Sequence, residues 1–378
     1  MDTPVKFSRI SRAGSAVLVG ALALTLAACG SDNNTGSDAG TATASASAPA
    51  ANISGTFAGA GSSAQQKAIQ AWTAAFQGQN PNATINYDPS GSGAGRDKFI
   101  AGGLAWAGSD AYMSTDEVTK SQTFCGTDGA IDIPVYISPI AIAYNLKGVK
   151  DLKISAENIA KIYTGKITTW NDPALTADNP GVTLPSTKIT PVHRSDKSGT
   201  THNFTDWMNK LAGDVWTNPG ADAWPLQGGD SAQGTSGVAG VLSATDGSVA
   251  YLDDSGVTSD LETAKINVGS AWAAPSAEGA AAVVSASPLA TGRGANDLAV
   301  DIDRKATADG DYPLVLVSYA IACQKYSDKA TGDFVKAWLS YIVSADAQNA
   351  AAQAAGSAPL TGDLQSKAAA AAAAITAG

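Results

Sequence analysis

Charged side chains are scarce in this sequence of 378 residues: Asp, Glu, Lys and Arg make up 15% of it, against roughly 25% in average soluble proteins. Basic residues are also outnumbered, with 24 Lys and Arg against 34 Asp and Glu, and the formal net charge is -10. Such a chain repels polyphosphate backbones at long range, which excludes electrostatically driven nucleic-acid binding. Hydrophobic residues still reach 44%, so the chain is globular and long enough for a packed core.

Common catalytic motifs are missing as well. The sequence has no G-x-S-x-G, no G-x-x-x-x-G-K-[ST] and no G-x-G-x-x-G, and so it gives no support to a hydrolase elbow, a P-loop or a dinucleotide site. The only histidines are His193 and His202, and their spacing from the cysteines fits no zinc pattern. We therefore expect no metal site, no cofactor and no catalysis.

The first 28 residues are expected to be an export signal. Three basic residues precede the apolar run from Ala16 to Leu26, which is shorter than the roughly 20 residues that a membrane-spanning helix needs. The run ends in the residues LAACG, which resemble a bacterial lipobox whose cysteine thiol accepts diacylglycerol. We expect residues 1–28 to be removed and Cys29 to be lipidated. The alternative is an ordinary signal peptide that ends beside a cysteine.

Residues 29–51 are expected to be the lipidated cysteine and a flexible tether, because residues 30–51 hold no large apolar side chain. No later segment has eighteen consecutive apolar residues, so the lipid would be the only membrane anchor. These features predict an exported protein held at the outer face of the bacterial cytoplasmic membrane.

Cys125 and Cys323 remain as an even pair once Cys29 is set aside. In an oxidising, extracytoplasmic setting, a structural disulfide between them is the expected state. A reactive thiol is the alternative, but it would need a base beside it.

Apolar, strand-like runs alternate with helical periodicity along the rest of the chain, and this pattern predicts α/β layers with a mainly parallel sheet. A helix is expected around residues 68–76 with Ser62 or Ser63 as its cap, another around 204–211 with His202 as a solvated residue of its first turns, and a surface helix at 367–377. Strands are expected at residues 83–88, 104–108, 131–137, 139–145, 248–252 and 314–322.

Three loops rich in Gly, Ser and Thr lead into predicted helices, at residues 59–63, 90–95 and 198–201. The free N–H groups and the positive dipole at a helix start attract anions, and glycine lets the backbone approach a ligand closely. We interpret the three loops as candidate anion-binding nests. The alternative is that they are ordinary turns.

Two charged residues lie near these loops. Arg194 precedes the third loop, and its forked guanidinium suits an oxyanion, whereas Asp110 follows the strand expected at 104–108. The alternatives are a surface ion pair between Arg194 and Asp196 and a helix cap at Asp110.

Five blocks, in this order, resemble the phosphate-binding protein of the bacterial phosphate ABC importer (PstS type). The resemblance covers roughly residues 55–345, and its most specific parts are the fourth and fifth blocks. The blocks are GAGSS at 59–63, SGSGAG at 90–95, GSDA at 108–111, IYTGKITTWNDP at 162–173 and RSDKSGTT at 194–201.

The resemblance implies a type II periplasmic-binding-protein fold, in which two α/β lobes joined by two hinge crossings close on phosphate. The crossings would fall near Ser138-Pro139 and just before Tyr312-Pro313. Lobe 1 would then combine residues 52–138 and 309–378, with both Cys125 and Cys323, and lobe 2 would be residues 139–308.

The resemblance also implies a set of phosphate ligands, in which Arg194 supplies the formal positive charge and Asp196 orients it. Arg96 would be an extra cation near the site, and we interpret it as a surface helix residue. The implied ligands are Ser63, the backbone N–H of Ala64 (where the family often has a bulkier residue), Ser92, Asp110, Arg194, Ser198, Gly199 and Thr200.

The expected function is capture of inorganic phosphate by a monomer, which then delivers it to the membrane permease of an ABC importer. Asp110 would accept the proton that phosphate carries and sulfate lacks. A secreted phosphatase on the same scaffold, or a receptor for another tetrahedral oxyanion, is the alternative.

Overall fold

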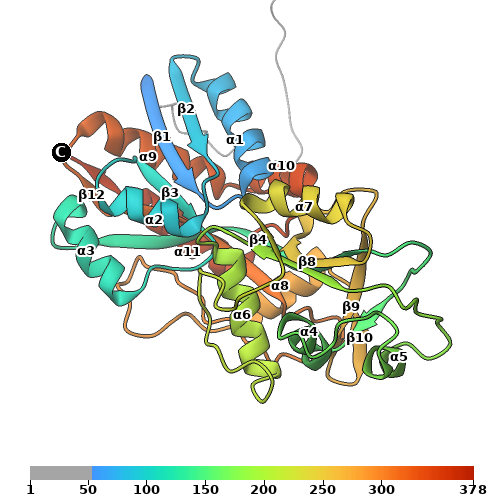
Figure 1. The fold of residues 1–378 in the computed structure, drawn as a ribbon. Coiled ribbons are helices and arrows are strands. Elements are labelled where there is room, and N and C mark those ends of the chain that lie inside the picture. The colour runs from blue at the N-terminus through green and yellow to red at the C-terminus, as the bar shows by residue number, and fades with distance from the viewer. Residues whose placement is uncertain (1–52) are drawn as a thin grey trace, which may run out of the picture. The chain divides into compact units, whose positions relative to one another are not determined.

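A mixed sheet of eleven strands runs through residues 53–378, which are the part of the chain that the computed structural model describes (Figure 1). The expected export signal, Cys29 and the tether lie outside these residues. Within them, no helix is both long and apolar enough to cross a membrane.

The main path of the sheet has the strand order β2-β1-β3-β11-β4-β8-β6-β7, and three further strands, β5, β9 and β10, pair beside it. A separate small sheet joins β12 to β13. The strands are β1 (Gly55–Gly61), β2 (Ala83–Asp88), β3 (Trp106–Ser109), β4 (Ala130–Asn145), β5 (Lys153–Ile154), β6 (Thr190–Arg194), β7 (Asp230–Ala232), β8 (Ser248–Asp253), β9 (Glu262–Val268), β10 (Ala271–Ala273), β11 (Val315–Cys323), β12 (Lys325–Tyr326) and β13 (Thr376–Ala377).

Strand β4 is the long strand that crosses the middle of Figure 1 and connects the two halves of the sheet. Its first part pairs with β11 as far as Pro139, and the part from Ile140 onward pairs with β8. The two strands expected at 131–137 and 139–145 are therefore one. Proline lacks the N–H that a ladder needs, and the chain passes Pro139 just where the strand changes its partner.

The expectation of a mainly parallel sheet is wrong. β11 is antiparallel to both β3 and β4, and β4 is antiparallel to β8 and β9. Parallel pairs flank this centre, where β1 pairs with β2 and β3, and β6 pairs with β7 and β8. An unbroken apolar run indicates a strand that is buried on both faces. It does not indicate whether the neighbouring strand is parallel or antiparallel.

Helices cover the sheet and begin in several cases directly at the end of a strand or loop (Figure 1). Their bounds are α1 (Gln66–Gln79), α2 (Ser92–Ile100), α3 (Thr115–Cys125), α4 (Ala156–Tyr163), α5 (Pro173–Asp178), α6 (Gly199–Leu211), α7 (Gly234–Ala244), α8 (Ala277–Ala286), α9 (Lys329–Ile342), α10 (Ala345–Ala355) and α11 (Gly362–Ala374), with a short 3-10 turn at Asp254–Gly256.

Two helix expectations need correction in detail. Helix α1 buries Ala68, Ile69, Trp72 and Phe76 as its spacing predicts, but its cap position is Gln65, which makes no side-chain capping bond. The two serines expected as caps point to other partners, described below. The alanine-rich tail forms α11, a surface helix with one face buried as expected, but it starts and ends earlier than expected.

A disulfide links Cys125 at the end of α3 to Cys323 at the end of β11, which confirms the expected pairing. Both residues are buried. The two cysteines are 198 positions apart in the sequence, so the bond ties the end of α3 to the central strand β11. Because a crosslink of this kind removes freedom from the unfolded chain, we expect it to stabilise the fold.

Replacing both cysteines with serine should lower the free energy of unfolding by about 2–5 kcal/mol. The measurement is urea unfolding of the wild type and of the Cys125→Ser/Cys323→Ser protein, each with and without reductant. Reduction should bring the wild type down to the variant and leave the variant unchanged. Equal stability of all four samples would contradict the prediction.

Candidate functional site

Three strand ends and three helix starts meet in one place. The carboxyl ends of β1, β3 and β6 lead into Ser62, Asp110 and Arg194, and the amino ends of α2, α6 and α7 lie beside them. All three loops singled out in the sequence lead into helices as predicted. Ligand sites of α/β proteins commonly lie at the carboxyl ends of strands, and this convergence marks the candidate site.

Asp110 is the most heavily bonded residue of the site. Its Oδ1 accepts hydrogen bonds from the hydroxyls of Ser62 and Ser318, each at 2.5 Å, and its Oδ2 accepts one from Thr200 at 3.1 Å. Its own backbone N–H donates to Oγ of Ser92 at 3.1 Å. The carboxylate therefore joins β1, β11 and α6 through hydroxyl groups.

The side chain of Asp110 is 3% exposed, and burial raises the pKa of this carboxyl group, while the three hydroxyls and the positive charge of Arg194 act in the opposite direction. The helix-cap alternative is wrong, because α3 is capped by Ser114. A buried carboxylate whose side-chain partners are hydroxyl groups can accept a further hydrogen bond from a ligand that carries a proton.

Arg194 lies at the end of β6 and is also buried, at 3% exposure. Its Nε and Nη2 donate to the two carboxylate oxygens of Asp196 at 2.8 and 2.5 Å. Asp196 accepts a further bond from the N–H of Gly234. Burial tends to raise the pKa of Asp196, but the guanidinium outweighs it and holds that pKa below its usual value.

The ion pair that the sequence suggested as the alternative for Arg194 thus exists, but it is buried rather than on the surface. The hydrogen bonds of this side chain come from Nε and Nη2. Within residues 53–378, no acceptor is found for the third nitrogen, Nη1 of Arg194. The pair fixes the orientation of the guanidinium and leaves one nitrogen for a ligand.

Neutral donors accompany this charge at the start of α6. Oγ of Ser198 caps the helix by accepting from the N–H of Thr201 at 3.3 Å. A Cβ on Gly199 would lie 2.7 Å from Oγ of Ser92 and 2.8 Å from Cβ of Asp110, so only glycine lets these segments approach. No acceptor among the described residues takes the N–H groups of Gly199 and Thr200. A helix start with free N–H groups suits an anion.

Ser63 and Ala64 lie beside the cluster but already have partners. Oγ of Ser63 accepts from the N–H of Thr235 and lies 3.0 Å from its hydroxyl. The N–H of Ala64 donates to Oγ of Ser62 at 3.1 Å. Both serines expected as caps of α1 are thus engaged in the site, which is why the helix is left without a side-chain cap.

Three residues of the site were not found from the sequence: Ser62 as a partner of Asp110, Thr235 at the start of α7, and Ser318 inside β11. Residues 234–237 read GTSG, the composition of a fourth nest before a helix. Ser318 is a polar residue in a strand that is buried along its whole length, and that mismatch was its only signal.

Arg96 is not a surface residue, and that interpretation is wrong. It is 6% exposed, and its Nε and Nη1 donate at 2.8 Å to Glu117 and to Oγ of Ser109. Its Nη2 pairs with Asp222. Helix α2 is short and has no apolar face, so the sequence around Arg96 gives no sign that this residue is buried. The partners of Arg96 come from other segments of the chain.

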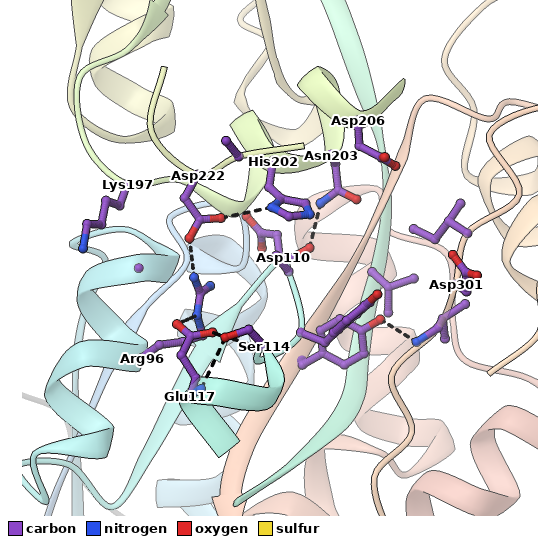
Figure 2. Close-up of a pocket in the computed structure, with 18 of the residues that line it drawn as sticks. Arg96, Asp110, Ser114, Glu117, Lys197, His202, Asn203, Asp206, Asp222 and Asp301 are labelled. Carbon is purple, nitrogen blue, oxygen red and sulfur yellow. Dashed lines mark hydrogen bonds and ion pairs between the residues drawn. The ribbon is translucent and has the colours of Figure 1, made fainter. Parts of the chain in front are cut away.

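A cavity of about 670 Å³ adjoins the cluster (Figure 2). Its wall includes Arg96, Asp110, Glu117, His202 and Asp222. Of the expected phosphate ligands Asp110 alone lines it, so the cavity lies next to the donors rather than among them.

His202 lies in the first turns of α6 as expected, and its side chain is half-exposed. Within residues 53–378, no group of three His, Cys, Asp or Glu side chains is placed to hold a metal ion.

The arrangement can bind a small anion that carries hydrogen. One fixed guanidinium nitrogen, two free backbone N–H groups and serine hydroxyls are donors, while Asp110 is a buried acceptor among them. The fold is that of a ligand-binding protein with its site at the strand ends.

Solved structures of binding proteins share this fold. The structure of the periplasmic phosphate-binding protein PfluDING with bound phosphate matches with a TM-score of 0.65 at 22% identity, covering 84% of this chain and 93% of that one. A phosphate-binding protein from Stenotrophomonas maltophilia matches with a TM-score of 0.64 at 19% identity, covering 84% and 94%. The predicted α/β fold of the periplasmic-binding type is confirmed.

Sequence relatives define the family more narrowly than the solved structures do. Residues 46–346 match the PBP superfamily domain. The chain is 35% identical to phosphate-binding protein PstS 2 of Mycobacterium tuberculosis over 387 residues, covering 98% of this chain and all of that one. It is 32% identical to phosphate-binding protein PstS of Xylella fastidiosa over 289 residues, covering 74% and 76%. The chain belongs to the PBP superfamily and, within it, to the family of PstS-type phosphate-binding proteins.

Gly199→Ala should destabilise the protein by about 1–3 kcal/mol, because the new methyl group would press on Ser92 and Asp110. The matched control is Gly240→Ala, also in a helix, where a Cβ meets nothing within 4 Å and alanine should stabilise by about 0.5–1 kcal/mol. Denaturant unfolding measures both. Stabilisation by Gly199→Ala would show that the segments are not packed this closely.

Proposed function

We propose that this chain captures inorganic phosphate outside the cytoplasm and delivers it to the membrane permease of a phosphate ABC importer. The observation that carries the proposal is the buried Asp110 carboxylate beside a fixed guanidinium and free helix-start N–H groups. Membership in the PstS family supports the same conclusion. The relatives are named as binding proteins, and the chain acts as a carrier without chemical change of its cargo.

The donors would divide the phosphate oxygens among them. Nη1 of Arg194 supplies the positive charge, and the N–H groups of Gly199 and Thr200 donate from the start of α6. The hydroxyls of Ser92 and Ser198 each accept one backbone bond and keep their own hydrogen for the ligand. Ser63 and the N–H of Ala64 would have to exchange a protein partner for phosphate.

Asp110 would select phosphate over sulfate. Phosphate near neutral pH carries a proton that it can donate to a carboxylate, whereas sulfate has none. Against sulfate, the carboxylate would face a bare oxygen and a buried acceptor would lose its partner, which costs about 1–3 kcal/mol or more. Sites that satisfy a buried polar group discriminate most strongly against the analogue that lacks it.

Two lobes would close over the ligand. In the proposed division, Asp110 and Ser63 belong to lobe 1, and they contact Thr200 and Thr235 of lobe 2. Asn203 donates to the carbonyl oxygens of both Asp110 and Gly199, at 2.7 and 2.8 Å. These contacts support a closed state in which both lobes build the site.

The crossings would lie at Ser138-Pro139 and just before Tyr312-Pro313. Beside them, β4 leaves β11 for β8 at Ile140, whose N–H donates to Leu314. The stretch at 289–300 returns to the first lobe's strands, since the N–H of Leu298 donates to Asp132 and that of Val300 to the hydroxyl of Tyr319. We therefore assign this stretch to lobe 1, although it precedes residue 309.

Export and anchoring complete the proposal. Removal of residues 1–28, lipidation of Cys29 and a tether to residue 51 would keep a monomeric binding body at the outer face of the cytoplasmic membrane. The binding body is then free to meet the permease by diffusion over a short distance.

Calorimetric titration of a protein that begins at residue 49, and so contains all of the described residues, tests the function directly. After removal of bound ligand, phosphate should bind with a stoichiometry of one, and sulfate in the same buffer should give no saturable heat. A parallel assay with an aryl phosphate should release no product. Binding of sulfate alone, or hydrolysis of the ester, would overturn the proposal.

Asp110→Asn should erode the preference for phosphate over sulfate by about 10- to 100-fold, because an amide N–H can donate to sulfate while the acceptor for the phosphate proton is reduced. Competitive titration of both anions measures the ratio. The matched control is Asp333→Asn, an exposed carboxylate in α9 that pairs with Lys329 and should leave both affinities unchanged. An equal loss for the two anions would show that Asp110 does not select between them.

A further inference from the structure

A buried ion pair connects two segments that belong to different lobes in the proposed division. Arg96 lies in α2, and Asp222 lies in the segment between α6 and β7 (Figure 2). Nη2 of Arg96 donates to Oδ2 of Asp222. Their side chains are only 7% and 14% exposed, so the pair is largely shielded from water.

Arg96 is fully engaged by protein groups. Besides Asp222, it binds Glu117 of α3 through Nε and Ser109 of β3 through Nη1, each at 2.8 Å. Although burial works against the charged form, the two carboxylates outweigh it and raise the pKa of Arg96. Each nitrogen of Arg96 thus has a protein partner, whereas Nη1 of Arg194 has none among the described residues.

The pair is attached to the site at both ends. Oγ of Ser109 accepts from Arg96 and donates to the carbonyl oxygen of Ala111 at 2.5 Å, and so it brackets Asp110 from both sides in the sequence. At the other end, the carbonyl oxygen of Asp222 accepts from the N–H of Ser198 at 3.0 Å. One ion pair therefore connects the turn that carries Asp110 to the start of α6.

His202 supports Asp222 from the same side. Its Nδ1 lies 3.5 Å from Oδ1 of Asp222, one helical turn after Ser198. Burial tends to raise the pKa of Asp222, but His202 and Arg96 lower it to about 2. Asp222 thus remains charged and faces Arg96 across the boundary.

A second ion pair across the same boundary offers a comparison. Lys197 and Asp97 approach to 3.2 Å, but their side chains are 61% and 63% exposed. Exposed pairs of this kind contribute about 0–1 kcal/mol. The removal of one partner from a buried pair costs more, because the other charge stays buried with less compensation, here with Glu117 as its remaining carboxylate.

We propose that Arg96 and Asp222 form a latch that holds the closed state and sets the rate of phosphate release. This inference rests on the proposed function. Opening separates Arg96 from Asp222, whereas Glu117 lies on the side of Arg96 and keeps it positioned for the next closure. The latch touches no phosphate oxygen, and it acts through the population of the closed state.

Asp222→Asn is the test, because it removes the charge and keeps the size. The dissociation rate of ³²P-phosphate, chased with unlabelled phosphate, should rise at least about tenfold, the loss of about 1.4 kcal/mol from the closed state. The association rate should stay within about twofold, because the donors to phosphate are unchanged. Thermal unfolding without ligand serves as the check on folding.

Asp97→Asn is the matched control across the same boundary and should change neither rate by more than about twofold. Arg96→Lys gives a second route to the result if Asp222→Asn folds poorly, because a lysine keeps the charge but cannot hold three partners. The two changes should not add when combined, since each breaks the same pair.

Three results overturn the latch: an unchanged release rate in Asp222→Asn, a loss of affinity that comes from slower association, or an equal effect of Asp97→Asn. Small-angle scattering without phosphate separates this inference from the proposed function. If the wild type binds no phosphate, the function fails. The latch then still predicts a larger radius of gyration for Asp222→Asn than for the wild type, and equal radii contradict it.

Discussion

A carboxylate buried from water needs donors, and Asp110 takes its donors from three elements that are far apart in the sequence. Ser62 follows β1, Ser318 lies inside β11 and Thr200 lies in the first turn of α6. The close approach that these bonds require explains why Gly199 has no room for a side chain. The sheet order, the helix starts and the packing of the loops all serve to bring these groups within hydrogen-bond distance of one residue.

The buried arginines around the site obey the same constraint as Asp110, because a buried charge needs partners. Arg194 and Arg96 are each held by carboxylates: Arg194 by Asp196, and Arg96 by Glu117 and Asp222. The guanidinium of Arg194 keeps a nitrogen for a ligand, whereas every nitrogen of Arg96 donates to a protein group. A protein with a net charge of -10 can therefore bind an anion, because short-range donors in a dry site outweigh a screened long-range field.

Rigidity and movement are separated in this fold. The disulfide between Cys125 and Cys323 joins elements on one side of the proposed hinge, so it can brace that side without restricting closure. Strand β4 passes through the proposed crossing as one continuous strand, which limits the motion to a bend and a change of contacts. The buried pair of Arg96 and Asp222, by contrast, crosses the boundary between the proposed lobes, so it has to break when the lobes part.

The sequence by itself determined the elements and the chemistry of the site. Periodicity located α1, α6 and the strands β2, β3, β4, β8 and β11, and the Gly/Ser/Thr loops predicted helix starts suited to an anion, because backbone conformation and capping are local properties. Tertiary structure alone decided the strand directions, the continuity of β4 through Pro139 and the partners of Asp110. It also decided that Arg96 is buried, since pairing across the sheet and across the boundary joins residues more than a hundred positions apart, and no local pattern records such a contact.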